Sequence, residues 1–337
     1  MDAVAAAKSR THDAAYLGPR VSRGMSPRLS AELIADLVDA GSREHYADAA
    51  LYDYEYRRRR ADVVFYRDLA RKRLGAGGRI LELGAGSGRV TIPLARAGFD
   101  VVAMDGSPAM LAKLRARVAA LPSAVANRIT IIEGDLRDFA IAQRSGARTA
   151  KSGARTAKSG RQTTKLDQFP LVIAVFNVLE HLYTRVELDA CLRCVAAHLA
   201  PGGAFAFDVQ LPDLAWLLRD PTKRWAKTRF TDPTTGRAMY YSTNHDYDPV
   251  GQIALIRLYY EPVDGKGPTK IVKLSQRKFF PAELEALVAH AGLRVVERYG
   301  DFGWRPLDGT AESQVLVCEA SISRRGNAVA RRGFRHP

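Results

Sequence analysis

Five short apolar runs that alternate with amphipathic helical stretches place the strongest constraint on how this chain can fold. The runs are RILELG, DVVAMD, ITIIEGD, LVIAVFN and GAFAFDV, at residues 79–84, 100–105, 129–135, 171–177 and 203–209. Helical patterns lie near 89–97, 107–120 and 185–199. Apolar strands separated by helices are typical of a parallel sheet that is covered on both faces. The sequence therefore predicts an α/β fold.

Two helical stretches precede these runs. SAELIADLVDAG predicts a helix with Ser30 as its N-cap and Gly41 as its C-terminal stop. Residues 43–74 form a polar, aromatic helical stretch, in which we expect Arg57–Arg60 to be a solvated helix face.

The pattern changes after the fifth run. Period-two segments within 212–278, separated by DPVG and DGKG, predict an antiparallel meander, which we interpret as an insertion covering the mouth of the sheet. A helix at 281–291, ended by Gly292, and strands at 293–299 and 314–320 complete the predicted elements.

A seven-residue unit, SGARTAK, is written twice and begun a third time at residues 145–160, between the third and fourth runs. Apart from Ala, Gly, Ser and Thr it contains only Arg and Lys, so it has no apolar stripe at helical or strand period. Such a segment buries too little surface to offset its ordering entropy, and we predict that 144–165 is a disordered loop. The alternative is a basic RNA-binding arm, but the segment lacks aromatic side chains that would stack on bases.

The formal net charge of +15 is concentrated in three segments. Residues 1–29, 140–165 and 321–337 carry the whole excess, and the remaining positions hold equal numbers of basic and acidic residues. We expect disordered basic segments at 1–29 and 321–337 around a neutral folded domain at 30–320.

No run approaches the about twenty apolar residues of a membrane span. The three cysteines suit a reducing compartment, so a cytoplasmic location is expected.

Three acidic residues stand at or near the ends of the first three predicted strands. The first strand carries Glu82 and runs into a GxGxG turn, where backbone N–H groups can approach a ligand at a helix N-terminus. Asp105 ends the second strand, where a carboxylate can accept both hydroxyls of a ribose, and Asp135 follows the third, placed for the exocyclic amine of adenine. A purely structural glycine turn is the alternative, which the joint spacing of the acids disfavours.

These motifs resemble those of the class I S-adenosylmethionine-dependent methyltransferases, over roughly residues 45–320. The matching segments are ELGAGSG, MDGSPAML, GDLRDF, FNVLEHL and HLAPGG. The resemblance implies a Rossmann-like, mostly parallel seven-stranded sheet with an antiparallel last strand, and S-adenosylmethionine as cofactor. It places the glycine turn at the methionine moiety, Asp105 at the ribose, Asp135 and Leu136 at adenine, and Phe176 and Asn177 at the amino acid end. The expected cofactor-binding residues are Tyr56, Glu82, Gly84, Ala85, Gly86, Gly88, Asp105, Gly106, Ser107, Met110, Asp135, Leu136, Arg137, Phe176, Asn177 and Val178.

The chain organisation is most similar to bacterial enzymes that methylate small molecules. We therefore predict methyl transfer to an oxygen, nitrogen or carbon atom of a small-molecule acceptor, with neither nucleic acid nor a membrane as partner. An acidic nucleophile has to lose a proton, and His181 and Glu180 near the fourth strand end are the candidate catalytic residues. His181 can instead be structural, and Glu180 can instead orient the loop.

Two alternative functions stay open. One is an RNA or protein methyltransferase that docks through its basic segments, although no Asn-Pro-Pro-Tyr type tetrad follows the fourth strand. The other is a non-catalytic cofactor-binding module.

Several further residues could serve the site or only the core. Tyr52 and Tyr56 are either core residues or a cover over the cofactor, and Trp216, Tyr241, Arg257 and Tyr259 could line an acceptor pocket. Cys191 and Cys194 have the local spacing of a zinc knuckle, but there is no second pair and the stretch is helical. We expect these cysteines to pack, and no metal site.

Overall fold

The computed structural model describes residues 29–143 and 165–321. The predictions of disorder for 1–29, 144–165 and 321–337 fall outside this range, apart from the end residues 29, 165 and 321.

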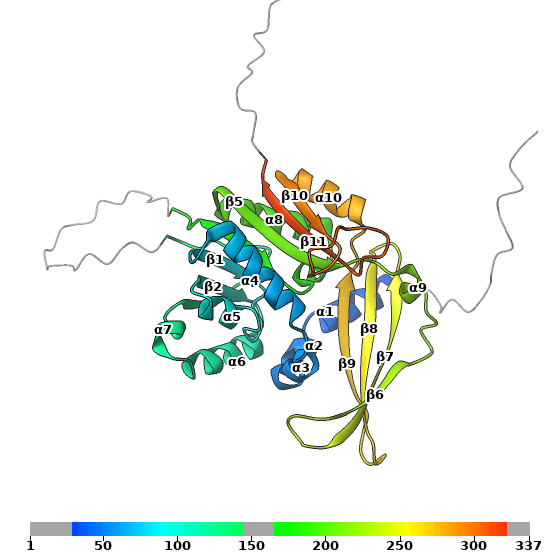
Figure 1. Ribbon diagram of the computed structural model, residues 1–337. Coiled ribbons are helices and arrows are strands. Elements are labelled where there is room, and N and C mark those ends of the chain that lie inside the picture. The colour runs from blue at the N-terminus through cyan, green and yellow to red at the C-terminus, as the bar shows by residue number, and fades with distance from the viewer. Residues whose placement is uncertain (1–28, 144–164, 322–337) are drawn as a thin grey trace, which may run out of the picture.

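A seven-stranded sheet forms the centre of the molecule (Figure 1). Its strands lie in the order β10-β11-β5-β4-β1-β2-β3; β11 runs antiparallel to β10 and β5, and all other neighbouring strands are parallel. All five apolar runs form strands, so the predicted Rossmann-like sheet with an antiparallel last strand is confirmed. The strands are β1 (Arg79–Leu83), β2 (Asp100–Asp105), β3 (Ile129–Glu133), β4 (Phe169–Ala174), β5 (Leu199–Gln210), β10 (Leu293–Tyr299) and β11 (Ser313–Ala320).

Helices cover both faces of this sheet because successive strand residues point to opposite sides. Ile80 packs with α4 (Ala61–Leu74), α5 (Thr91–Arg96) and α6 (Pro108–Ala119) on one face. Its neighbour Leu81 packs with α8 (Arg185–His198) and α10 (Pro281–His290) on the other. A short helix, α7 (Ser123–Ala126), precedes β3.

The strand order reverses between β1 and β4, which lie side by side. Strands β2 and β3 extend the sheet from β1 in one direction, and β5 extends it from β4 in the other. In such sheets the crevice at the carboxyl ends of the strands, at the reversal, is the usual ligand site.

A second sheet of four antiparallel strands lies beside the first (Figure 1). Its strands are β6 (Trp225–Thr231), β7 (Ala238–Asp248), β8 (Ile253–Pro262) and β9 (Lys270–Arg277), and the short helix α9 (Leu214–Leu217) leads into them. The meander predicted within 212–278 is therefore a separate sheet. The alternation of polar and apolar residues did not predict β6, because most residues of this strand are exposed.

Three N-terminal helices connect the two sheets. They are α1 (Ala31–Gly41), α2 (Glu44–Ala47) and α3 (Ala49–Tyr56). Helix α1 packs on β8 and β9, and α2 contacts both β9 and α6. Ser30 caps α1 as predicted, with its hydroxyl accepting from Leu33 N at 3.2 Å.

Gly41 ends α1 at the predicted residue but for a different reason. Its φ angle is not in the left-handed region that a glycine stop uses. A Cβ at Gly41 would instead come within 2.5 Å of Ser275 N, so the missing side chain lets α1 approach β9 closely.

The prediction that Arg57–Arg60 forms a solvated helix face is wrong in its secondary structure. These residues are exposed but form the turn between α3 and α4. The Arg59 guanidinium lies over the Phe176 ring, 4.5 Å from its centre, so this turn reaches the end of β4.

Residues on either side of 144–164 meet in a two-stranded bridge. Ala142 pairs with Leu166, and Gln143 N donates to Lys165 O at 2.9 Å. The chain therefore leaves and re-enters the described structure at one place. In residues 29–143 and 165–321, no helix is long and apolar enough to cross a membrane.

Because these flanking residues already meet, we predict that a short Gly-Ser linker can replace residues 145–160. Each doubling of loop length changes the closure entropy by only about 0.6 kcal/mol, so melting temperature and S-adenosylmethionine affinity should stay nearly unchanged. Differential scanning fluorimetry and calorimetric titration measure the two quantities. A large loss of either would show that the repeat packs or binds.

Candidate active site

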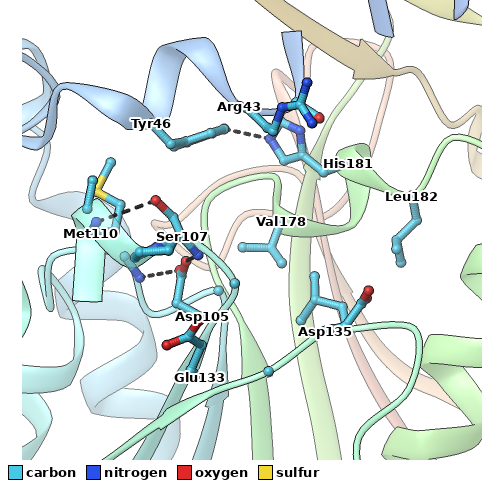
Figure 2. Close-up of a pocket in the computed structure, with 18 of the residues that line it drawn as sticks. Arg43, Tyr46, Asp105, Ser107, Met110, Glu133, Asp135, Val178, His181 and Leu182 are labelled. Atoms are coloured by element: carbon cyan, nitrogen blue, oxygen red, sulfur yellow. Dashed lines mark hydrogen bonds between the residues drawn. The ribbon is translucent and has the colours of Figure 1, made fainter. Parts of the chain in front are cut away.

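A cavity of about 870 Å³ opens at the carboxyl ends of β1 to β4, where the strand order reverses (Figure 2). Its volume lies in the usual range of about 300–1,000 Å³ for ligand pockets. Residues from α2 and α3 contribute to its wall, together with η1 (Val178–His181), the 3₁₀ turn after β4. The lining comprises Ser42, Arg43, Tyr46, Ala47, Tyr52, Gly84, Gly86, Asp105, Gly106, Ser107, Pro108, Ala109, Met110, Glu133, Gly134, Asp135, Leu136, Arg137, Val175, Phe176, Val178, His181, Leu182 and Tyr183.

The glycine turn after β1 leaves its backbone bare to the cavity. Gly84 and Gly86 both have positive φ angles, +68° and +55°. A Cβ at Gly84 would overlap Val178, whereas one at Gly86 would project into open space. Ala85 and Gly88 shape the turn through the bond from Gly88 N to Ala85 O at 3.0 Å, but they do not line the cavity. A ligand can therefore approach the peptide backbone at Gly84 and Gly86.

Asp105 is held rigidly at the end of β2. One carboxylate oxygen accepts from Gly86 N at 2.7 Å and the other accepts from Ser107 N at 2.8 Å. Burial raises the pKa of Asp105, and the backbone hydrogen bonds oppose that shift. Each oxygen keeps further acceptor capacity for a ligand hydroxyl. The geometry fits the expected ribose contact.

Asp135 forms an ion pair with Arg137 at the mouth of the cavity. Arg137 Nη2 lies 2.7 Å from its carboxylate, and the same guanidinium also bonds Glu187 at 2.9 Å. Hydrogen bonds from Arg137 lower the pKa of Asp135. An adenine amine would therefore have to share or replace the bonds to Arg137.

Glu82 does not line the cavity. It is 2% exposed and accepts a 2.6 Å hydrogen bond from the Thr91 hydroxyl, beneath the glycine turn. Burial raises the pKa of Glu82 to about 7. In this structure the residue supports the start of α5. Its role as a cofactor ligand stays a prediction, as do those of the other expected residues.

Two strained residues shape the end of β4. Phe176 and Asn177 have φ angles of +74° and +61°, a conformation that costs about 1–3 kcal/mol for a non-glycine residue. Both oxygens of the buried Asp208 carboxylate accept from their backbone N–H groups, at 2.9 to 3.2 Å, and Tyr66 donates to it at 2.8 Å. Burial raises the pKa of Asp208 to about 6. The carboxylate thus holds Phe176 in the cavity wall, whereas Asn177 does not line the cavity.

Glu180 also lies outside the cavity, in a buried ion pair. Its carboxylate is 2.8 Å from Lys278 Nζ and accepts from Gln210 N at 2.8 Å. Lys278, 1% exposed, donates to Gln210 and Gln276 as well, at 2.7 and 3.0 Å. The pair ties η1 to the ends of β5 and β9. Of the two roles considered for Glu180, this arrangement favours orientation of the loop over proton transfer.

His181 lines the cavity, but both ring nitrogens have partners. Nε2 lies 2.6 Å from the Tyr46 hydroxyl and Nδ1 lies 3.2 Å from the Tyr183 hydroxyl. Burial lowers the pKa of His181 to about 3, and His45 and Lys278 add to the shift. The imidazole is therefore neutral near pH 7 and a weak base there, which argues against the expected general-base role.

Aromatic side chains from α2 and α3 cover one wall of the site. Tyr52 lines the cavity, and its ring centre lies 4.7 Å from that of Tyr56. Tyr56 itself packs behind it, with its hydroxyl 3.3 Å from His45 Nε2 and its ring 4.8 Å from that of Phe176. Of the two tyrosines left open by the sequence, only Tyr52 faces the ligand space.

Several other residues considered from the sequence pack away from the cavity. None of Trp216, Tyr241, Arg257 and Tyr259 lines the cavity: Trp216 stacks on His245, and Arg257 pairs with Asp246. Cys191 is fully buried in α8 with a raised pKa caused by burial, in agreement with packing. Among the described residues no cluster of three potential metal ligands occurs.

The sequence did not predict the residues that position the cavity wall, which are Asp208, Lys278 and Tyr46. Asp208 and Lys278 lie on or beside strands, and their burial has no local signal, since strand ends often carry exposed charges. Tyr46 belongs to an aromatic stretch whose other tyrosines look the same in sequence. Only the packing of α2 against η1 distinguishes it.

Comparisons with known proteins identify the family of this chain. A family model described as a methyltransferase domain matches residues 52–246, more than half of the chain. The chain belongs to this methyltransferase family. The predicted methyltransferase family is thereby confirmed, and S-adenosylmethionine is the cofactor that the resemblance implies.

The individual relatives match this chain either over a short segment or at low sequence identity. An uncharacterized methyltransferase of Mycobacterium bovis is 47% identical over 66 residues, which cover 20% of this chain and 26% of that protein. The match thus spans about a quarter of the relative's length. The CcbJ methyltransferase from Streptomyces caelestis is 24% identical, with a TM-score of 0.62 over 83% of this chain and 99% of that one. An S-adenosylmethionine-dependent methyltransferase from Clostridium acetobutylicum is 14% identical, with a TM-score of 0.58 over 80% and 96%. These two structures show the shared fold.

The residues present fit the cofactor. The bare backbone at Gly84 and Gly86 leaves room that any side chain would reduce, and Asp105 offers acceptors for hydroxyl groups. Asp105 and Glu133 face the cavity, and neither forms an ion pair with another described residue. A cavity with unpaired carboxylates is electrostatically suited to a cationic sulfonium.

Replacing Asp105 should weaken cofactor binding strongly. In Asp105→Ala two ligand hydroxyls lose a charged acceptor, at about 1.5–3 kcal/mol per bond, so the Kd for S-adenosylmethionine should rise by at least about 100-fold. Calorimetric titration measures it. Asp100→Ala, at the exposed other end of the same strand, is the matched control. Unchanged affinity in Asp105→Ala would contradict the ribose assignment.

Breaking the Glu180–Lys278 pair on one side should destabilise the fold. Lys278→Met leaves a buried carboxylate without its partner, which lowers the free energy of unfolding by about 3–5 kcal/mol. In the double variant Glu180→Gln, Lys278→Met no charge is left buried, so the loss should be smaller. Urea unfolding measures both. A double variant as unstable as the single one would show that the pair is not the source of the effect.

Proposed function

We propose that this protein transfers the methyl group of S-adenosylmethionine to a small-molecule acceptor. The observation that carries the proposal is the position of the cavity: it joins Asp105 and the glycine turn to a region walled by Tyr46, Tyr52 and His181. Figure 2 shows Tyr46 and His181 meeting across the cavity from Asp105 and Glu133. We assign the first region to the cofactor and the second to the acceptor.

When bound, the cofactor supplies an electrophilic methyl group carried by a sulfonium. The chain contributes orientation: Asp105 fixes the ribose, the backbone of the glycine turn lies along the methionine moiety, and the rigid Phe176 turn bounds the amino acid end. The aromatic wall from α2 and α3 keeps water from the reacting atoms. Holding two reactants in line is a large part of the catalytic effect in such a transfer.

The charges of the site favour a small molecule over a nucleic acid. Two arginines line the cavity, and both have carboxylate partners: Arg43 pairs with Asp39, and Arg137 pairs with Asp135 and Glu187. Phosphate backbones are normally bound by available Lys and Arg side chains. The basic segments 1–29, 140–165 and 321–337 are the feature that favours a polymeric acceptor, and they make it the second candidate.

The remaining parts of the proposal concern organisation and location. We propose that residues 30–320 form one methyltransferase domain with basic segments on either side of it and within it. A cytoplasmic location is proposed from the cysteine-poor sequence.

The decisive test is a methyl-acceptor screen with the full chain. Metabolite extracts, total RNA and protein are each incubated with S-adenosylmethionine that carries a CD₃ group, and products are identified by mass spectrometry. We expect label in low-molecular-weight products, with rates that change less than about threefold between 50 and 200 mM salt, because no phosphate contacts are involved.

Other outcomes separate the alternatives. Label in RNA or protein, lost steeply over the same salt range, would contradict the small-molecule proposal. Cofactor binding without any labelled product would indicate a non-catalytic module.

A further inference from the structure

A chain of hydrogen bonds runs from the acceptor region of the cavity to the backbone of α1. Tyr46, His181, Tyr183 and Ser275 are linked in sequence at 2.6, 3.2 and 2.7 Å. Ser275 Oγ then lies 3.0 Å from Val38 O. These residues come from α2, η1, the loop after η1, and β9.

The last link fixes the direction of the bonds before it. A backbone carbonyl only accepts, so the Ser275 hydroxyl donates its proton to Val38 O. Ser275 Oγ must therefore accept from Tyr183. The second Ser275 contact of Tyr183, its carbonyl oxygen at 3.2 Å, also requires Tyr183 to donate. The Tyr183 proton is thus directed toward Ser275.

The same reasoning determines the tautomer of His181. With its own proton used, Tyr183 can only accept from the imidazole, so Nδ1 carries the hydrogen. Burial among neutral groups and near Lys278 keeps the ring uncharged. A neutral imidazole has one N–H, so Nε2 presents a lone pair. Tyr46 must then donate its hydroxyl proton to Nε2.

We infer that Tyr46 presents its hydroxyl oxygen to the cavity only as a hydrogen-bond acceptor, and that the methyl-accepting atom is a neutral amine nitrogen whose N–H it receives. The inference rests on the proposed function and specifies its acceptor.

The chain explains why an amine suits this position better than a hydroxyl. A hydroxyl nucleophile has to give up its proton as it reacts. Tyr46 could take that proton only by passing its own to His181, whose pKa burial lowers to about 3, and the chain ends on a backbone carbonyl that is not basic enough to keep a proton. An amine nitrogen already has a free lone pair. It forms the bond to the methyl carbon, the electron pair of the broken carbon–sulfur bond stays on sulfur, and the charged nitrogen loses its proton to water after the product has left the cavity.

The surrounding groups agree with a nitrogen that becomes positively charged. The rings of Tyr46 and Tyr52 lie 5.7 Å apart in the wall of the cavity, and aromatic faces attract cations. Tyr46 Oη is a hydrogen-bond acceptor for the N–H of the charged product. No arginine of the described lining lacks a carboxylate partner, so no unpaired cation opposes the charge.

Nitrogen-15 NMR of the histidine rings tests the hydrogen-bond direction without any reaction. The full chain is labelled at histidine, and the His181 signals are assigned by their loss in His181→Gln. We expect a neutral ring protonated on Nδ1. Tyr183→Phe removes the group that fixes this tautomer and should shift the ring toward a mixture. A wild-type ring protonated on Nε2, or on both nitrogens, would overturn the inference.

The accepting atom is tested with the CD₃-labelled products of the acceptor screen. Fragmentation should place the label on nitrogen, and Tyr46→Phe should lower kcat/KM for the amine by roughly 3–10-fold, the value of one hydrogen bond, with unchanged cofactor Kd. Tyr247→Phe, on β7 and outside the cavity, is the matched control.

The failures of the two proposals can be told apart. Label on oxygen or carbon would overturn the amine inference and leave the proposed function intact. Absence of any labelled product would contradict the proposed function, while the NMR result would still decide the direction of the chain.

Discussion

The buried ion pair between Glu180 and Lys278 is the interaction on which the arrangement of the site depends. It is the point at which η1, the end of β5 and the end of β9 are joined. The next residue along η1 is His181, so the position of the imidazole follows from where Glu180 is anchored. A charge pair at this depth is costly to desolvate, and it is tolerated because every donor of the lysine has a partner.

A second buried carboxylate, Asp208, complements the ion pair on the other side of the same loop. It fixes two consecutive left-handed residues at the end of β4. Glu180 and Asp208 therefore hold the two ends of the segment 176–181 with acids that never reach the ligand. Site geometry here comes from buried electrostatics, whereas the lining itself is mostly backbone, aromatic and aliphatic.

The sequence predicts the fold well because its evidence is periodic and local. Each apolar run forms a strand, and the glycine turn and Asp105 lie together at the cavity as their strand positions require. Prediction fails where burial depends on distant partners. Glu82 and Glu180 have the residue type of site acids but point into the core, and Lys278 becomes a core residue only because three oxygens converge on it. Tyr46 is distinguished from its neighbours by a histidine 135 positions away.

The bridge between Ala142 and Leu166 lies near the starts of β1 and β2, at the edge of the sheet opposite the cavity. Sequence added between these two residues enters at the amino edge, while every group that contacts a ligand is positioned from the carboxyl edge. A change in the number of repeat units at this position would therefore leave the residues that line the cavity where they are. We interpret the tandem SGARTAK copies as a local duplication that is tolerated for this reason.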